Sequence, residues 1–501
     1  MFDTGDSLRH TTTINNLPDN ALLEIFDFYR KSQRHALHRL SNAWKWHSLV
    51  HVCHRWRHIV LASPIRLHLR ILCTLGTPVR DLGIWPDIPI VIKYYYPDMD
   101  YHSRFDGLTL TPDDELDVIA ALGHPHRVWA VVLGPVTGSQ LGKVAAVMQE
   151  PFPVLTCLKI HSNDEDVPVL PIEFLGGSAP CLQDIHLHGI PYPALPTLLF
   201  STSNLVNLEL YHIPPTGYLP PEVMVACLAA SPKLDKFILE FQMATTFPER
   251  IHPLPLTRTV VPQPSLTLFR FRGDSDYLED LLARIDGPET NWLLINYIHQ
   301  PVGFRFAHLS RFIDRSIGPK LTLFEHARIL FEREKVCVDT YTLVDDPDDL
   351  DWRLARRLGR TSISCNGIDW QFSHSIQALS QISATLSAVV HLELDLCFLL
   401  TSPNDVEWLV FLLQFPTMRT LRTCRSLAGR VALALETLAL EDITGEMVSE
   451  VMPGLELICL EGQPASSVER FIAARQLSDR PVTFIHSKKE LYGRHESRMN
   501  T

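Results

Sequence analysis

The chain contains few glycines, no closely spaced cysteines and no surplus of basic residues. Glycine accounts for 23 and proline for 36 of its 501 residues, the reverse of the usual proportions of ~7% glycine and ~5% proline. Neither a G-x-x-x-x-G-K nor a G-x-G-x-x-G motif occurs in the sequence, so we expect no glycine-rich phosphate loop. The abundant proline predicts many short helices and strands.

The balance of charges argues against nucleic acid as a partner. Lysine and arginine total 45, aspartate and glutamate total 57, and the formal net charge is −12. No general positive field is therefore available to hold a phosphate backbone. Hydrophobic residues at 46% and charged residues at 20% are typical of a globular protein. The length allows about three ordinary domains or one long array of repeats.

The cysteine spacing and the short apolar runs indicate in which cell compartment the protein is expected. The ten cysteines lie 20 or more residues apart, which excludes the C-x-x-C pairs of zinc ribbons and redox motifs. No N-x-[S/T] acceptor and no signal-peptide pattern occur, and the longest apolar run, 408–415, is far shorter than the ~18 residues that cross a bilayer. We therefore expect a cytoplasmic and/or nuclear protein with reduced cysteines and no membrane partner.

Two amphipathic helices are predicted near the N-terminus. The first begins near Pro18 and carries apolar residues at i, i+3, i+4 and i+7 from Leu22 to Tyr29. The second covers residues 46–62 and ends before Pro64, because a proline disfavours the helical conformation of the residue that precedes it. Residues 30–44 are basic and weakly patterned, which predicts a loop or a short frayed helix.

After Pro64 the sequence acquires a repeated pattern. Residues 66–71 alternate as a strand would. Further on, a leucine is followed at +3 and +5 by apolar residues, which predicts a short strand whose inward side chains fill a core shared with the next copy. Helix-capable segments at 223–230, 275–285, 406–415 and 468–477 alternate with these strands. The copies begin at Leu155, Leu182, Leu205, Leu234, Leu266, Leu435 and Leu455, with a looser copy at Val389.

This pattern resembles leucine-rich repeats, although the asparagine usual eight residues after the first leucine occurs only at Asn163. The resemblance implies an α/β fold for residues 63–486, an irregular solenoid with a parallel sheet and outer helices. An ordinary α/β domain with leucine-flanked strands is the alternative. Residues 288–385 keep the pattern poorly and are either distorted repeats or an insertion, and the tails 1–13 and 487–501 are expected to be disordered.

A second resemblance concerns residues 14–62. Leu17-Pro18, Ile25-Phe26 and Val52-Cys53-x-x-Trp56 follow one another in the order found in an F-box. The interval 30–45 is longer and more basic than usual, and Arg66-Leu67 stands where a tryptophan is common. Segment 44–89, with Ser63-Pro64 and Ile84-Trp85-Pro86, is similar to the F-box proteins of mushroom-forming fungi.

The F-box resemblance implies docking onto the Skp-family adaptor of a cullin-type (SCF) ubiquitin ligase. The apolar face of the first helix also suits a helix-in-groove contact. The alternative is that the two helices only cap the following repeats. The expected adaptor-binding residues are Leu17, Pro18, Leu22, Ile25, Phe26, Leu49, Val52, Cys53, Trp56 and Ile59.

Other motifs give no support for catalysis, a metal or a cofactor. The second helix carries a histidine stripe with no acidic or cysteine ligand at metal spacing, so a polar surface is expected there. Asp98-Met-Asp100 and Asp274-Ser-Asp276 match the short D-x-D pattern of glycosyltransferases, and both are interpreted as loop aspartates. The acidic run 345–351 is expected to be a solvated loop. The stripe consists of His47, His51, His54 and His58.

The leading hypothesis is a non-catalytic substrate receptor whose repeats bind a protein destined for ubiquitin transfer. The alternative is a repeat scaffold that binds partners without ubiquitin transfer. In a solenoid, residues between and just after the apolar strand positions face outward, so they are the predicted substrate-binding residues. They are Lys159, His161, His186, His188, Glu209, Tyr211 and Glu240.

Overall fold

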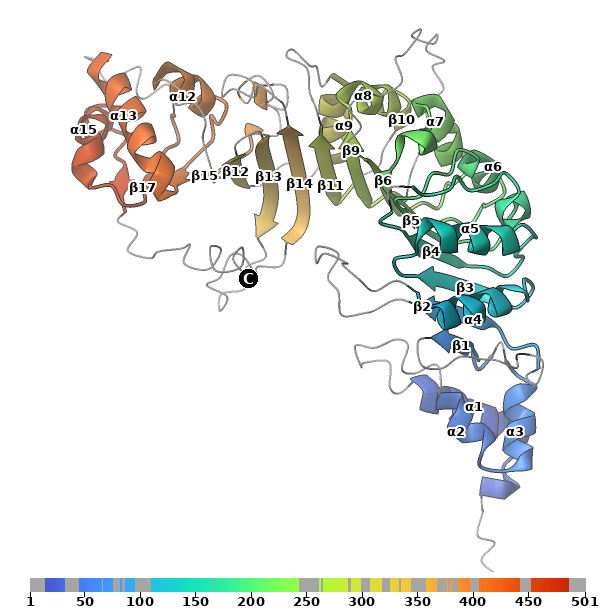
Figure 1. Ribbon diagram of the computed structural model, residues 1–501. Helices are drawn as coiled ribbons and strands as arrows, with labels where there is room; N and C mark the ends of the chain where they lie inside the picture. Colours follow the sequence, from blue (N-terminus) through green and yellow to red (C-terminus); the bar gives the residue numbers. More distant parts are fainter. Residues whose placement is uncertain are drawn as a thin grey trace, which may run out of the picture. The chain divides into compact units, whose positions relative to one another are not determined.

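The computed structural model describes residues 14–31, 45–64, 66–74, 82, 86–94, 110–164, 166–242, 261–262, 265–286, 290–298, 307–317, 325–332, 335–343, 357–366, 376, 379–380, 386–396, 405–441 and 452–485. The predicted tails, residues 32–44 of the predicted loop, Asp98 with Asp100, and the run 345–351 lie outside these residues. The chain divides into two compact units, 1–204 and 205–501. Within the described residues the main sheet has sixteen mostly parallel strands, and the fold is α/β (Figure 1).

The first unit begins with helices η1 (Ile14–Asn16), α1 (Asp19–Lys31), α2 (Lys45–Val50) and α3 (His54–Leu61). The single helix predicted over 46–62 is therefore wrong. Cys53 has an extended backbone, and its sulfur accepts a hydrogen bond from the Trp56 N–H at 3.5 Å. This contact caps the start of α3, whereas α2 already ends at Val50. The strand predicted over 66–71 is also wrong, because a turn occupies 66–68 and the strand begins at Ile71.

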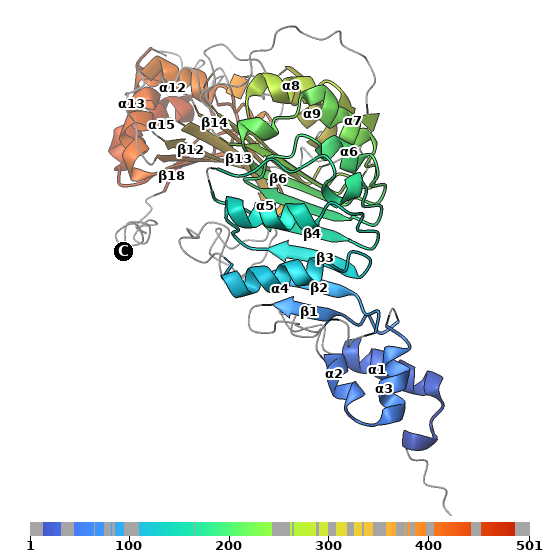
Figure 2. The ribbon, with the colours of Figure 1, turned by 45° about the vertical axis from the view of Figure 1, so that its right-hand side comes forward.

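Five parallel strands follow in chain order: β1 (Ile71–Thr74), β2 (Ile90–Tyr94), β3 (Val128–Leu133), β4 (Cys157–His161) and β5 (Asp184–His188). Helices α4 (Pro112–Leu122) and α5 (Gly138–Val147) cover one face of them (Figure 2). Both helices start with a capping box, formed by Thr111 with Asp114 and by Thr137 with Gln140. Later connections contain η3 (Phe174–Gly177) and α6 (Leu195–Leu199).

The second unit contributes eleven strands to the sheet, in the order β6-β7-β9-β11-β14-β13-β12-β15-β16-β17-β18. Strands β8 (Val261–Pro262) and β10 (Ile285–Asp286) pair separately. The eleven are β6 (Asn207–Ile213), β7 (Lys236–Phe241), β9 (Leu268–Gly273), β11 (Trp292–Tyr297), β12 (His326–Glu332), β13 (Lys335–Leu343), β14 (Arg357–Asn366), β15 (His391–Leu396), β16 (Thr420–Thr423), β17 (Leu457–Leu460) and β18 (Thr483–Phe484). Its helices are η4 (Pro215–Gly217), α7 (Pro221–Ala229), α8 (Ser275–Leu282), α9 (Ala307–Ile317), α12 (Asp405–Leu412), α13 (Arg425–Glu441), η6 (Ala465–Val468) and α15 (Glu469–Leu477).

The repeat pattern locates most strands correctly. Each copy except one gives a strand that starts two residues after its first apolar residue, as β4 does after Leu155 and β17 does after Leu455. The four helix-capable segments correspond to α7, α8, α12 and α15. The copy at Leu435 is wrong, because residues 425–441 form helix α13. That segment is rich in Leu and Ala and buries residues at helical spacing, including Leu427, Val431 and Leu435.

Residues 288–385 depart from the repeats in a specific way. Strand β11 continues the parallel array between β9 and β14. Strand β13, however, runs antiparallel to both β12 and β14. The order β14-β13-β12 reverses the chain order, and β12 then pairs in parallel with β15. Strands β12, β13 and β14 therefore form a three-stranded antiparallel group within an otherwise parallel sheet.

The core of each unit lies between the strands and the helices. In the second unit the ring centroids of Phe269 and of Phe312 on α9 lie 5.7 Å apart. Those of Phe331 and of Trp408 on α12 lie 5.9 Å apart. Because strand side chains alternate between faces, the residues beside these phenylalanines, such as Arg270 beside Phe269, point to the opposite face. No helix in the described part of the chain is long and apolar enough to span a bilayer.

Candidate protein-interaction site

The three N-terminal helices enclose a small core. Phe26 is 1% exposed, and its ring centroid lies 4.7 Å from that of Trp56. Leu22 and Ile59 are also buried there. The prediction that Leu22, Phe26 and Ile59 belong to a surface patch is therefore wrong for the free chain: they face the other helices, and their contribution is to hold the module together.

Other apolar residues of this module do lie on its surface. Ile25, Phe28 and Tyr29 of α1 are exposed, and Phe28 is 72% exposed. Their spacing of i, i+3 and i+4 places them on one side of the helix. Sequence reasoning missed Phe28 because it lies outside the amphipathic stripe. An aromatic residue outside the stripe of an amphipathic helix is the signal that identifies it.

The remaining predicted adaptor-binding residues divide by exposure. Pro18, Val52 and Cys53 are exposed, whereas Leu17, Leu49 and Trp56 are partly buried. All six are described, and the exposed three are the more accessible to a partner. Ile14 is a further exposed apolar residue at the start of the module.

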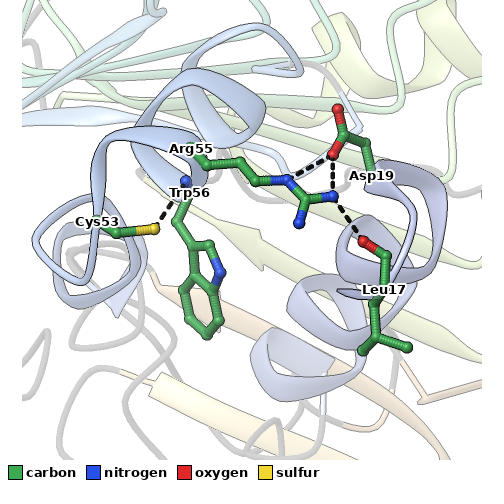
Figure 3. A network of polar contacts seen from close by, with 5 residues as sticks. All are labelled: Leu17, Asp19, Cys53, Arg55 and Trp56. Carbon is green, nitrogen blue, oxygen red and sulfur yellow. Dashed lines mark hydrogen bonds and ion pairs between the residues drawn. The ribbon is translucent and has the colours of Figure 1, made fainter. Parts of the chain in front are cut away.

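A polar clamp positions the start of α1 against α3 (Figure 3). Arg55 donates from Nε to Asp19 Oδ1 at 3.0 Å and from Nη2 to the same oxygen at 2.6 Å. Its Nη2 also donates to the Leu17 carbonyl at 2.6 Å. Because the Asp19 side chain is 61% and the Arg55 side chain 39% exposed, water screens the ion pair and it contributes little stability. Its main effect is geometric, since it fixes the Leu17-Pro18 turn beside α3.

Two contacts join the helices to the start of the sheet. Trp46 donates from Nε1 to the Arg70 carbonyl at 3.1 Å, and Arg66 forms an ion pair with Glu24. The Arg70 guanidinium lies 4.4 Å from the Trp129 ring centroid on β3, a cation–π distance. The helical module is therefore attached to the first strands of its unit by specific polar contacts.

The four histidines of the stripe differ in exposure. Burial, followed by the charge of His51, lowers the pKa of His47, while His51, His54 and His58 are exposed. Among the described residues no group of three or more His, Cys, Asp or Glu side chains could hold a metal ion. Asp274 of the second D-x-D motif caps α8 by accepting hydrogen bonds from the N–H groups of Asp276 and Tyr277.

In the first unit the predicted substrate-binding residues lie on two neighbouring strands. Lys159 on β4 is in register with His186 on β5, and His161 is in register with His188. The rings of His161 and His188 meet edge to face at 4.0 Å, and His161 Nε2 lies 2.7 Å from Asn163 Oδ1. His161 and His186 are buried, so the prediction that they project freely is wrong. Lys159 and His188 are partly exposed.

In the second unit the predicted residues form a charged cluster. Glu209 accepts a hydrogen bond from the Tyr211 hydroxyl at 3.0 Å and pairs with Lys236 Nζ at 2.9 Å. Burial and the neighbouring Glu209 charge raise the pKa of Tyr211. Glu240 pairs with Arg270 Nε at 2.5 Å. Glu209 and Glu240 are buried, and the prediction that they are free surface acids is wrong, because cations on adjacent strands cover them.

No protein-family model matches the chain, and none of the curated proteins compared with it is similar.

Proposed function

We propose that the protein is a substrate-recognition subunit of a cullin-type ubiquitin ligase, in which the N-terminal helices act as an F-box and the irregular leucine-rich-repeat-like region binds a protein substrate. The observation that carries the proposal is the exposed apolar side of α1, formed by Ile25, Phe28 and Tyr29. Clustered exposed apolar side chains are typical of a docking surface. In this proposal the ubiquitin chemistry belongs to other subunits, and the chain works in the cytoplasm and/or nucleus.

The polar clamp supports the same proposal. Arg55 holds Leu17-Pro18 next to α3 through the Leu17 carbonyl and Asp19. The order of Leu17-Pro18, Ile25-Phe26 and Trp56 that resembles an F-box thus corresponds to one small helical module. The occupant that we propose for its exposed side is a Skp-family adaptor, which brings the cullin.

The test is titration calorimetry of the full chain against a Skp-family adaptor. Replacing both Ile25 and Phe28 with alanine should weaken binding by at least about tenfold, since interface hot spots cost ~2 kcal/mol or more. Leu116→Ala is the matched control, because Leu116 is an exposed leucine of the same unit on α4. Unchanged adaptor binding by the double variant would remove the basis of the proposal.

A scaffold that binds partners without ubiquitin transfer is the second candidate. It is favoured by the contacts from Trp46 to the Arg70 carbonyl and from Arg66 to Glu24, which are those of helices that cap a sheet. The same titration separates the two candidates. A scaffold would show no adaptor binding with the wild-type chain.

A further inference from the structure

Strand β9 places two arginines on the face of the sheet opposite the helices. Its sequence alternates Phe269, Arg270, Phe271 and Arg272. Both phenylalanines are fully buried, and Phe269 contacts Phe312 of α9. Arg270 and Arg272 must therefore point to the other face.

The ion pairs around Arg270 are layered, with the acids inside and the cations outside. The Glu240 side chain is 3% exposed, whereas that of its partner Arg270 is 40% exposed. The Glu209 side chain is 11% exposed and that of its partner Lys236 is 32% exposed. The carboxylates thus lie beneath, and the ammonium and guanidinium groups face solvent. A protein of net charge −12 therefore has a locally cationic outer layer here.

The same contacts hold the cations in place. The Tyr211 ring centroid lies 5.8 Å from Arg270 Cζ, and the Tyr211 hydroxyl donates to Glu209. A guanidinium that is oriented by an ion pair and an aromatic ring loses little freedom when it binds a further acceptor. Arg270 pairs with Glu240 through Nε, and its side chain as a whole remains 40% exposed.

Arg272, the second arginine of β9, adds a further positive charge to the same face of the sheet. It is in register with Glu240 on β7 and with Asn296 on β11. Nevertheless, its Nε is buried without a hydrogen-bond partner among the described residues, and so are the neighbouring acceptors Asn296 Oδ1 and Glu240 Oε1. A buried donor without a partner is costly and rare in folded proteins. The Arg272 side chain as a whole is only partly buried, and its in-register acid Glu240 forms its ion pair with Arg270, so the charge of Arg272 adds to the positive charge of this face.

We propose that Lys236, Arg270 and Arg272 bind an acidic segment of a partner protein, whose carboxylates accept hydrogen bonds from the two guanidinium groups. The planar guanidinium fork matches a carboxylate in shape and charge. The three cations exceed the two neighbouring acids, Glu209 and Glu240, so the cluster retains positive charge. The inference rests on the proposed function only in taking this partner protein to be the substrate of the ligase.

The experiment uses the full chain and a fluorescent peptide of about ten residues that alternates glutamate and alanine. Fluorescence anisotropy should show binding of this peptide and at least about tenfold weaker binding of the matched glutamine–alanine peptide. Binding of the acidic peptide should weaken as ionic strength rises from about 0.05 to about 0.3 M. Equal binding of the two peptides would overturn the proposal, and so would displacement of the acidic peptide by equimolar inorganic phosphate.

Arg272→Gln should weaken binding of the acidic peptide by about tenfold, as expected for the loss of a charge-assisted hydrogen bond. Arg272→Lys keeps the positive charge but loses the planar guanidinium group, so its affinity for the acidic peptide should lie between those of the wild type and Arg272→Gln. Arg311→Gln is the control, since Arg311 is exposed on α9, the helix on the opposite face. Equal peptide binding by Arg272→Gln and the wild type would overturn the assignment. Adaptor titrations of the same variants should be unchanged, so failure of the peptide site and failure of the F-box proposal give different results.

Discussion

The rings of Phe26 and Trp56 lie with their centroids 4.7 Å apart and their planes tilted by 58°. Phe26 comes from α1 and Trp56 from α3, so this contact joins the first and third helices of the N-terminal module. Two residues later on α1, Phe28 points to solvent. Neighbouring phenylalanines on one helix therefore have different roles, one in the core and one on the surface.

Phe26→Ala should destabilise the helical module by ~3–5 kcal/mol, the usual cost of truncating a buried phenylalanine. Phe28→Ala should change stability by less than ~0.5 kcal/mol, as is usual for surface residues. Hydrogen exchange of the α1 and α3 amides measures both effects. Equal protection in the two variants would mean that Phe26 does not hold the helices together.

The sequence predicted the positions of the strands better than the burial and the ion-pair partners of the polar residues on them. The apolar triplet at Leu205 located β6, because burial of alternate side chains fixes the strand. The same pattern placed Glu209 and Glu240 on the polar face but gave no sign that Lys236 and Arg270 would cover them. Those cations lie on neighbouring strands about 30 residues away in sequence, and only the register of the sheet brings them together.

In the N-terminal module, too, the sequence pattern predicted the elements but not the surroundings of each side chain. The helical period predicted the apolar stripe of α1, yet it could not decide which apolar residues face α3 and which face solvent. The break at Cys53 was also not predictable from periodicity, because the stripe continues across it. The strand predicted from Leu435 is wrong because the leucines there fit a helix as well as a strand. The neighbouring alanines favour the helix.

Glu240→Ala should destabilise the second unit by ~1–3 kcal/mol. The buried carboxylate pairs with Arg270, and removing it leaves a partly buried guanidinium unpaired. The cost is below that of a fully buried pair, because the guanidinium reaches water. Glu456→Ala is the control, since its pair with Arg419 is exposed on both sides and contributes little. Urea unfolding of both variants should show a clear difference, and equal midpoints would contradict the layered arrangement.

Two glycines of the first unit should respond to alanine in opposite directions. Gly189 has φ +68°, and an added Cβ would lie 2.4 Å from the Ser162 carbonyl oxygen. Gly189→Ala should therefore cost at least ~1–2 kcal/mol. Gly142 lies inside α5 with nothing within 4 Å of an added Cβ, so Gly142→Ala should stabilise by ~0.5–1 kcal/mol. Thermal unfolding of the two variants checks the sign of each change.

The stacked pair of His326 and His391 should make the second unit sensitive to acid. Their rings lie 4.5 Å apart on neighbouring strands β12 and β15. Burial, followed by the charges of His391 and Arg422, lowers the pKa of His326 from 6.5 to about 4. Burial also lowers the pKa of His391, with Arg422 and Arg419 lowering it further and Glu325 opposing them.

A lowered pKa means that the unfolded chain binds more protons than the folded one between about pH 4 and 6.5. The contribution of His326 to stability is therefore complete above pH 6.5 and is lost as the pH falls towards 4. His326→Gln should flatten the dependence of unfolding free energy on pH in this range, because glutamine does not titrate. Denaturant unfolding of wild type and variant at several pH values measures the difference. His124→Gln is the control, since His124 is a histidine of the first unit outside any strand. A slope unchanged by His326→Gln would show that His326 titrates equally in the folded and unfolded chain.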